Sequence, residues 1–258
     1  MTDPVEIRSR DNPLLVRLRK LAQDNTAYRK EGAVWLEGDH LMRACLARGH
    51  ALQDVVISES GWEQPDLRML SGQGRRAVRV PDALFRGISA LESPASIGAL
   101  VALPAATGID ADAASLVLDR LQDAGNVGSI LRSAAAFGVR QVLAIKGTAA
   151  LWSPKVLRAG MGAHFGLRLV EGLQVDDLAA LCVPLLATSS HAEQSVHRAR
   201  LPSPAAWVLG HEGQGVQPTL LDRCAALLAI PQPGGEESLN VAAAAAICLY
   251  ESARQAAD

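Results

Sequence analysis

The alternation of strand and helix signals after residue 115 constrains the fold of this 258-residue chain more than any other feature. Short apolar runs of strand length recur there between segments that have helical spacing. The expected strands cover residues 115–119, 141–145, 184–188, 206–210 and 226–230. The expected helices cover residues 126–137, a segment beginning at Ser153 and Pro154, and residues 216–223 and 238–255. This order predicts an α/β fold, with a mostly parallel sheet and helices on both of its faces.

The first part of the chain has the signals of a smaller α/β unit. Leucines at helical spacing follow Asn12, with basic residues between them, and Asp39 is expected to cap a helix that ends at Gly49. The expected strands cover residues 33–37, 54–58, 78–80 and 97–102. Residues 105–114 have the composition of a linker. We therefore expect one domain over residues 1–104 and a second over residues 115–258.

The charge of the chain limits how it can contact nucleic acid. The net charge is −2, which argues against a basic surface spread over the whole molecule. Seven basic residues nevertheless precede Gly32, against five acidic ones. This local excess can follow a phosphate backbone, or it can be the solvated face of a helix.

The remaining composition indicates an intracellular protein without a metal. Four widely spaced cysteines lie in apolar settings and are expected as small core residues: Cys45, Cys182, Cys224 and Cys248. The histidines show no metal-binding spacing, so no metal is expected. The N-terminus lacks the pattern of a signal peptide, and the longest apolar run, residues 241–250, is too short to cross a bilayer. We expect a cytoplasmic protein that does not contact the membrane.

Three stretches rich in glycine and polar residues follow three of the expected strands. They cover residues 126–132, 209–215 and 230–241. Ligands of open α/β sheets bind outside the carboxyl ends of the strands. The three stretches are therefore expected to meet and to form one binding site, which makes the chain look like an enzyme.

Five polar side chains in these stretches are the candidates for chemistry. Asn126 is either a helix cap or a ligand contact, and Arg132 is either a surface residue or an anion contact. Glu212 lies among glycines, where a carboxylate can accept hydrogen bonds or remain an exposed turn acid. Ser238 stands at the start of a helix, which it can simply cap. Asn240 can help to bind substrate or support Arg132. Residues 209–215 lack the order of a dinucleotide-binding fingerprint.

The three stretches together resemble the SpoU-type (TrmH-like) branch of the SPOUT methyltransferases. The first resembles the family's motif over residues 126–138, the second over 209–215 and the third over 230–251. The resemblance covers residues 115–256. It implies an RNA 2′-O-ribose methyltransferase that uses S-adenosylmethionine. The N-terminal part is similar to the ribosomal-protein-like RNA-binding domain that many of these enzymes carry.

The resemblance also implies a place for each candidate residue. The cofactor would meet backbone groups around Thr188, Gly210, Ile230 and Leu239, within a trefoil knot. The side chains that would face the ribose are those of Asn126, Arg132, Glu212, Ser238 and Asn240. An obligate homodimer with the active site at the subunit interface is a further implication.

The substrate and the class of protein leave alternatives open. The two-domain layout favours ribosomal RNA over transfer RNA. A catalytically silent RNA-binding protein of the same fold is one alternative, and an unrelated doubly wound nucleotide enzyme is another. All five polar side chains are present, which disfavours the first, and the nucleotide-binding motifs are absent, which disfavours the second.

Arg132 has two possible roles in such a reaction. The family's arginine is taken as the general base that removes the proton of the hydroxyl. A guanidinium is effectively always protonated, which argues against that role. In the other interpretation Arg132 grips the adjacent phosphate and orients the hydroxyl, while the proton leaves late or through water.

Overall fold

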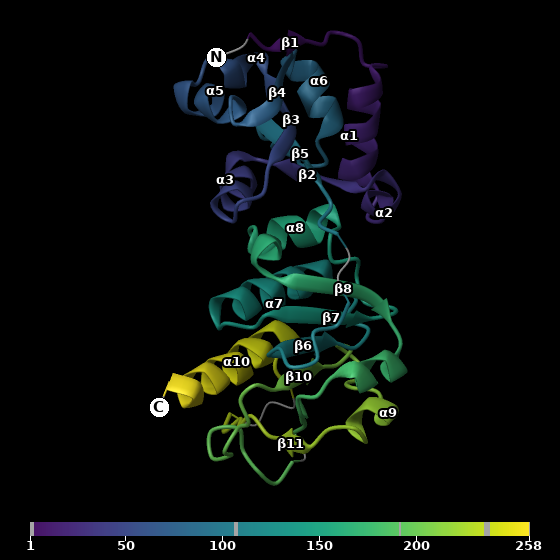
Figure 1. Ribbon diagram of the computed structural model, residues 1–258, viewed down its shortest axis with the longest axis vertical. Coiled ribbons are helices and arrows are strands. Elements are labelled where there is room, and N and C mark those ends of the chain that lie inside the picture. The colour runs from purple at the N-terminus through teal and green to yellow at the C-terminus, as the bar shows by residue number, and fades with distance from the viewer. Residues whose placement is uncertain (1–2, 106–107, 191, 235–237, 258) are drawn as a thin grey trace. The chain divides into compact units, whose positions relative to one another are not determined.

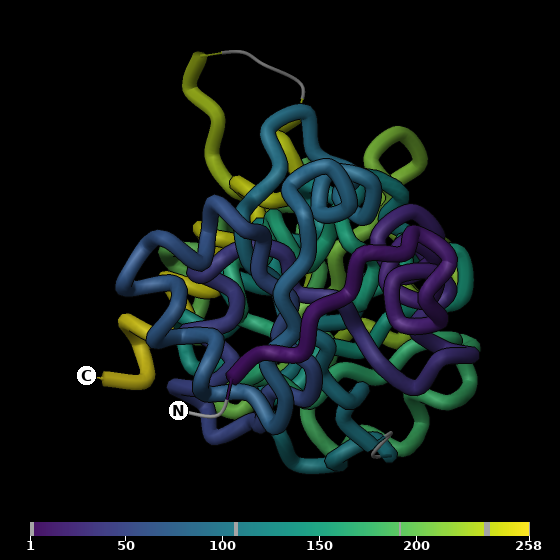
Figure 2. The backbone as a smooth tube through the Cα atoms, turned by 90° about the horizontal axis from the view of Figure 1, so that it is seen from above, coloured from purple at the N-terminus to yellow at the C-terminus, as the bar shows by residue number. Residues whose placement is uncertain are grey.

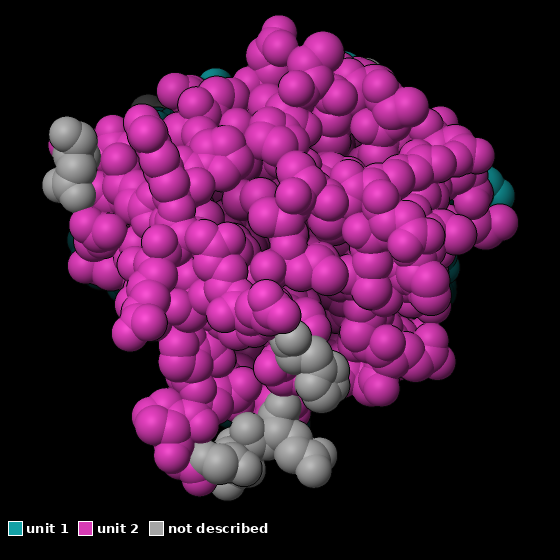
Figure 3. All heavy atoms as spheres, turned by 90° about the horizontal axis from the view of Figure 1, so that it is seen from below, with its two compact units in different colours: residues 1–105, 152–165 teal, residues 106–151, 166–258 magenta. Residues whose placement is uncertain are grey.

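The computed structural model describes residues 3–105, 108–190, 192–234 and 238–257. The chain divides into two compact units, coloured separately in Figure 3. The N-terminal unit comprises residues 1–105 and 152–165, and the C-terminal unit comprises residues 106–151 and 166–258. The segment 152–165, which the sequence assigned to the second domain, thus belongs to the N-terminal unit by its packing.

The N-terminal unit is built on a mixed five-stranded sheet. Its strands are β1 (Val5–Glu6), β2 (Ala33–Glu37), β3 (Leu52–Ser58), β4 (Gly74–Val80) and β5 (Ile97–Ala102). Their order is β1-β4-β3-β5-β2, and β5 runs antiparallel to both of its neighbours. The purple N-terminal segment of Figure 2 contains the short β1, which pairs with β4 at the sheet edge. The strands expected at 33–37 and 97–102 are confirmed, whereas β3 and β4 begin earlier than expected.

Seven helices of the N-terminal unit are described: α1 (Pro13–Gln23), α2 (Ala27–Glu31), α3 (Asp39–Ala47), α4 (Glu59–Trp62), α5 (Pro65–Ser71), α6 (Asp82–Ile88) and α8 (Pro154–Gly160). The side chain of Asn12 caps α1 by accepting a hydrogen bond from the Leu14 N–H at 3.0 Å. The expectation that Asp39 caps α3 is wrong. Gly38, with φ of +98°, holds the cap position, and Asp39 pairs with Arg43 one turn later.

The C-terminal unit contains the parallel sheet that the sequence predicts. Its strands are β6 (Ser115–Leu118), β7 (Gln141–Ile145), β8 (Arg168–Leu173), β9 (Leu185–Thr188), β10 (Ala206–Leu209) and β11 (Ala226–Leu228). Their order is β11-β9-β10-β6-β7-β8, and all pairings between these described strands are parallel. Strand β8 escaped prediction because it is a half-exposed edge strand that Gly172 interrupts at a φ of +76°.

Two longer helices of the C-terminal unit pack against each other, α7 (Ala124–Ala136) and α10 (Val241–Ala257) (Figure 1). Asp123 caps α7 by accepting a hydrogen bond from the Asn126 N–H at 2.7 Å, so Asn126 lies inside the helix rather than at its cap. Asn240 caps α10, since its side-chain oxygen accepts from the N–H groups of Ala242 and Ala243. Helix α10 therefore starts three residues later than the expected start at Ser238.

Shorter elements and the cysteines complete the description. The expected helix over residues 216–223 is the single turn α9 (Pro218–Leu221), and two 3₁₀ helices cover Ala163–Gly166 and Val175–Ala180. Cys45 and Cys248 are buried as expected, but Cys182 is exposed. In the part of the chain that is described, no helix is long and apolar enough to span a membrane.

Candidate active site

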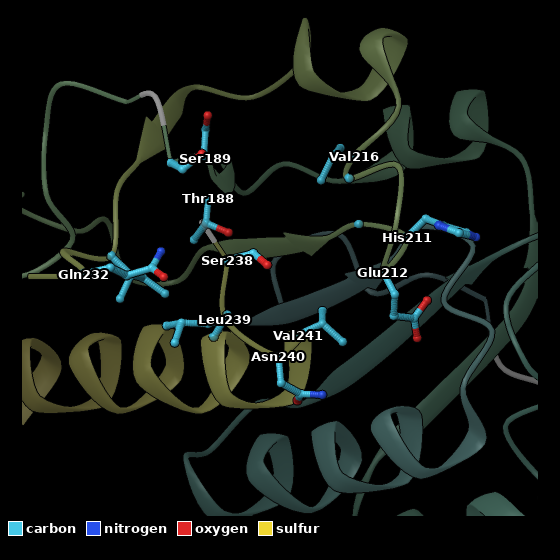
Figure 4. Close-up of a pocket in the computed structure, with 15 residues that line it drawn as sticks. Thr188, Ser189, His211, Glu212, Val216, Gln232, Ser238, Leu239, Asn240 and Val241 are labelled. Atoms are coloured by element: carbon cyan, nitrogen blue, oxygen red, sulfur yellow. The ribbon is translucent and has the colours of Figure 1, made fainter. Parts of the chain in front are cut away.

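A cavity of about 370 Å³ lies in the C-terminal unit, where the loops after three neighbouring strands meet (Figure 4). The loops follow β9, β10 and β11, which are adjacent in the sheet. Residues 188–190 come from the first loop, and residues 210–212, 215 and 216 come from the second. Residues 230, 232, 238–241 and 244 come from the third loop and the start of α10. The expected meeting of loops at the carboxyl ends of the strands therefore holds for the second and third glycine-rich stretches.

The loop after β10 is a closed turn that only glycine permits at Gly210. A Cβ atom there would lie 2.2 Å from the carbonyl carbon of Gly215 and from the nitrogen of Val216. His211 and Gly215 exchange two backbone hydrogen bonds of 3.0 and 2.8 Å, and Gly215 has φ of +68°. The side chain of His211 accepts a hydrogen bond at Nδ1 from the Gly213 N–H at 3.0 Å. The glycines thus hold the backbone of this turn against the cavity.

Asp119 anchors the same loop. The sequence analysis did not identify it as a residue of the site. Its side chain is fully buried directly after β6. The carboxylate accepts hydrogen bonds of 2.7 Å from the backbone and the side chain of Gln217, and it pairs with Arg120 at 2.8 Å. Arg120 also donates to the side chain of Gln214 at 3.2 Å. An acidic residue directly after a buried strand was the available signal.

Asn126, Glu212 and Asn240 form a hydrogen-bonded group that we call the amide–carboxylate cluster. The Asn126 amide nitrogen donates to Glu212 Oε1 at 3.3 Å, and the Asn240 amide nitrogen donates to Asn126 Oδ1 at 3.0 Å. Each of the three residues comes from a different glycine-rich stretch. The cluster therefore joins α7, the loop after β10 and the start of α10 at the edge of the cavity.

Glu212 is held as a carboxylate by the donors that surround it. Burial alone raises the pKa of its carboxyl group. Hydrogen bonds from its own N–H, from the backbone of Asp123 and Gln122 and from the Asn126 side chain outweigh burial and leave the pKa below its ordinary value. The two backbone donors lie at 3.2 and 3.3 Å. Glu212 is therefore ionised at neutral pH and fixed in orientation.

The other predicted site residues fall into two groups. The four residues predicted to contact the cofactor, and also Ser238, line the cavity: Thr188, Gly210, Ile230, Leu239 and Ser238. Arg132 is apart from them. It is exposed on α7, and its side chain makes no hydrogen bond or ion pair with the described residues and does not line the cavity.

A parallel α/β sheet whose loops enclose a polar cavity at the strand ends defines an enzyme-like fold with a small-molecule site. The SpoU rRNA Methylase family model matches residues 113–250, which is more than half of the chain. The protein belongs to this family, as its three sequence motifs predicted.

Relatives cover nearly the whole chain as well. The 23S rRNA (guanosine(2553)-2′-O)-methyltransferase RlmP of Bacillus subtilis is 30% identical over 86% of this chain and 88% of its own length. A solved RNA 2′-O ribose methyltransferase is 30% identical, with a TM-score of 0.81, over 98% of this chain and 100% of its own. The AdoMet-bound rRNA methyltransferase of Sinorhizobium meliloti is 25% identical, with a TM-score of 0.82, over 96% and 97% of the two chains.

Proposed function

We propose that this protein is an RNA methyltransferase that transfers the methyl group of S-adenosylmethionine to a ribose 2′-hydroxyl. The observation that carries the proposal is the cavity at the strand ends with the amide–carboxylate cluster at its edge. The similarity to a 2′-O-methyltransferase and to an AdoMet-bound relative supports the reaction and the cofactor.

The cavity fits such a cofactor by its size and by its backbone. Its volume of about 370 Å³ lies within the range of small-molecule sites, about 300–1,000 Å³. The missing Cβ of Gly210 leaves the backbone of the loop open to close approach. Backbone and side-chain groups at Thr188, Ile230 and Leu239 would hold the cofactor, with Gly210 against it.

The chain's own residues orient the hydroxyl. S-Adenosylmethionine, when bound, supplies a methyl group that is already activated for transfer. The amide–carboxylate cluster fixes polar groups at the edge of the cavity, and Ser238 adds a hydroxyl to its lining. Alignment of the reacting atoms is the main task of such a site.

Neither Glu212 nor Arg132 suits the role of general base. The lowered pKa and the four donors of Glu212 make its carboxylate a weak proton acceptor. A guanidinium is a poor general base, and the exposed guanidinium of Arg132 can donate to a phosphate oxygen of the RNA. Arg132 therefore grips the phosphate next to the modified ribose, and the proton leaves to water.

The names of the relatives support ribosomal RNA as the substrate of this protein. RlmP is named for 23S rRNA, and the solved S. meliloti relative is an rRNA methyltransferase. Residues 1–104 would serve as the RNA substrate-binding domain, joined through the linker 105–114 to a methyltransferase domain over residues 115–258. The site of action would be the cytoplasm.

A homodimer would bury the exposed apolar side chains of α10. Ile247 is 39% exposed and Tyr250 is 57% exposed, and the small residues between Ala242 and Ile247 permit close packing. Tyr250 contacts Phe137 at the end of α7, with ring centroids 6.0 Å apart. The dimer would extend over this α7–α10 surface.

The trefoil knot of the family would lie around the cavity. After β11, Ile230, Gln232 and residues 238–241 line the cavity, and α10 follows. Helix α10 then packs against α7 and β10. This packing is compatible with the proposed knot at the C-terminal end of the domain.

Methyl transfer to RNA with identification of the product tests the proposal. The protein is incubated with methyl-labelled S-adenosylmethionine and total RNA from a strain that lacks its gene, and the RNA is digested to nucleosides. We expect one 2′-O-methylated nucleoside, which maps to ribosomal RNA. A methyl label on a base would contradict transfer to the ribose. A label found only in transfer RNA would show that the substrate is transfer RNA rather than ribosomal RNA. RNA binding without transfer would indicate a silent RNA-binding protein.

A further inference from the structure

The two ring nitrogens of His211 have different surroundings. Nδ1 accepts hydrogen bonds from the backbone N–H groups of Gly213 at 3.0 Å and Gln214 at 3.3 Å. A ring nitrogen that accepts a hydrogen bond carries no hydrogen, so the imidazole is neutral here and holds its hydrogen on Nε2. Nε2 is therefore a donor, and it makes no hydrogen bond with any residue that the structure describes.

Closure of the turn after β10 does not by itself require a histidine at position 211. The side chain of an asparagine or an aspartate can accept hydrogen bonds from the same two backbone N–H groups. What the imidazole adds is the Nε2–H group at the far side of the ring. The part of His211 that an asparagine could not replace is therefore the part that has no partner within the described chain.

The ring of His211 lies at the edge of the proposed substrate site. His211 is half-buried and lines the cavity. Figure 4 shows its ring on the same side of the cavity as the carboxylate of Glu212 and the amide of Asn240, two members of the amide–carboxylate cluster. The two bonds at Nδ1 and the two backbone bonds between His211 and Gly215 fix the orientation of the ring. The donor is thus preorganised for a ligand that reaches this edge.

The neighbouring charge restricts what this donor can bind. Glu212, the next residue in the chain, is ionised at neutral pH. Its carboxylate would repel the negative oxygen of a phosphate, whereas an uncharged oxygen of a nucleotide meets no such repulsion. His211 is also unsuited to remove a proton from the substrate, because the turn occupies Nδ1 and Nε2 already carries hydrogen.

We propose that the Nε2–H group of His211 donates a hydrogen bond to an uncharged acceptor on the RNA substrate and so positions the nucleotide whose ribose is methylated. This contact is separate from the contact between Arg132 and a phosphate. The inference rests on the proposed function, because it names a residue that recognises the substrate of that reaction.

Two variants separate the donor from the turn. His211→Ala removes both ring nitrogens. His211→Asn returns an oxygen that can accept the hydrogen bonds of the turn, but it places no donor where Nε2 lies. Each variant is measured by its Tm, by calorimetric titration with S-adenosylhomocysteine, and by kcat and KM for methyl transfer to total RNA from a strain that lacks the gene. His197→Asn, which changes an exposed histidine of the same unit, is the matched control.

We expect His211→Ala to have a lower Tm than the wild type, because the turn loses the bonds at Nδ1. His211→Asn should restore the Tm and bring the affinity for S-adenosylhomocysteine to within about twofold of the wild-type value. Its kcat/KM for RNA should nevertheless stay about three- to tenfold below that of the wild type, which is the effect of one lost hydrogen bond. His197→Asn should keep the kcat/KM of the wild type.

Three results would overturn the inference. A wild-type kcat/KM in His211→Asn would show that the histidine serves only to close the turn. A loss of affinity for S-adenosylhomocysteine in His211→Asn that equals its loss of kcat/KM would show that Nε2 contacts the cofactor instead. A wild-type protein that binds S-adenosylhomocysteine but transfers no methyl group to RNA would overturn the proposed function, and the inference with it.

Discussion

Asn126 and Arg132 lie on the same helix and differ in everything that surrounds them. Asn126 exchanges hydrogen bonds with Glu212 and Asn240, whereas Arg132 is exposed and has no polar partner among the described residues. Six residues at about 100° each place the two side chains about 120° apart around the helix axis. The folded chain thus fixes the side chain of Asn126 through its own hydrogen bonds. The side chain of Arg132 is left available to a ligand.

Replacement of Arg132 by alanine should have the largest effect on catalysis. We expect methyl transfer to fall by about 100-fold or more, because one preorganised contact to charge near the reaction is lost. The free energy of unfolding should change by less than about 0.5 kcal/mol, since the side chain is exposed. Single-turnover transfer measures the rate, and urea unfolding measures the stability. Arg140→Ala, another exposed arginine of this unit, is the matched control and should keep full activity.

Arg132→Lys separates the two roles of the arginine. If Arg132 grips a phosphate, the lysine variant should retain part of the activity, with no new rise in rate as the pH increases through neutrality. A rate that follows deprotonation of the lysine would favour the role of general base instead.

Glu212→Gln should have the next largest effect, because it removes the charge around which the amide–carboxylate cluster is arranged. Hydrogen bonds to a charged group contribute about 1.5–3 kcal/mol, so we expect turnover to fall about tenfold or more. A variant with wild-type turnover would show that the cluster is not needed for the reaction. Glu193→Gln changes an exposed acid of the same unit and serves as the control.

Asp119→Asn should affect stability and cofactor binding more than the chemical step. The buried carboxylate holds Gln217 and Arg120, so its neutralisation should lower the free energy of unfolding by about 1–3 kcal/mol. Cofactor affinity should fall because the loop after β10 loosens. Urea unfolding of this variant and of Asp222→Asn, an exposed acid, gives the comparison. Equal stability of the two variants would rule out the anchoring role.

Glu251→Gln on α10 should have the smallest effect, and that effect should be a change in how the free energy of unfolding depends on pH. Hydrogen bonds from Arg254 and Gln255 lower its pKa from 4.5 to about 2. Its contribution to stability is therefore complete above pH 4.5 and is lost as the pH falls from 4.5 towards about 2. Glu251→Gln should weaken the dependence of stability on pH in that window, measured by urea unfolding at several pH values. Parallel pH profiles for the two proteins would contradict this assignment.

The sequence was most informative where local chemistry decides the structure. The apolar runs placed the central strands of the C-terminal unit, and the glycine-rich stretches placed the residues that line the cavity. Helix starts shifted by two or three residues, because Asp123 and Asn240 hold the cap positions rather than the residues expected.

Other features depend on contacts that a sequence does not display. The carboxylate of Asp119 accepts a hydrogen bond from Gln217, which lies almost a hundred positions away in the sequence. Segment 152–165 joins the N-terminal unit through its packing, which no local signal indicated. The role of Arg132 was inferred from the sequence motif alone, because its side chain has no polar partner among the described residues.

Calorimetric titration of S-adenosylmethionine into the wild type and into Arg132→Ala shows whether the cavity binds the cofactor without help from the arginine. The molecular mass in solution is taken from the same samples. We expect both proteins to be dimers and to bind one cofactor per chain with the same Kd. Absence of binding by the intact wild-type protein, alone and with total RNA present, would contradict the assignment of the cavity. A tenfold or larger loss of affinity in Arg132→Ala would contradict the separation between the cavity and the arginine that serves the RNA.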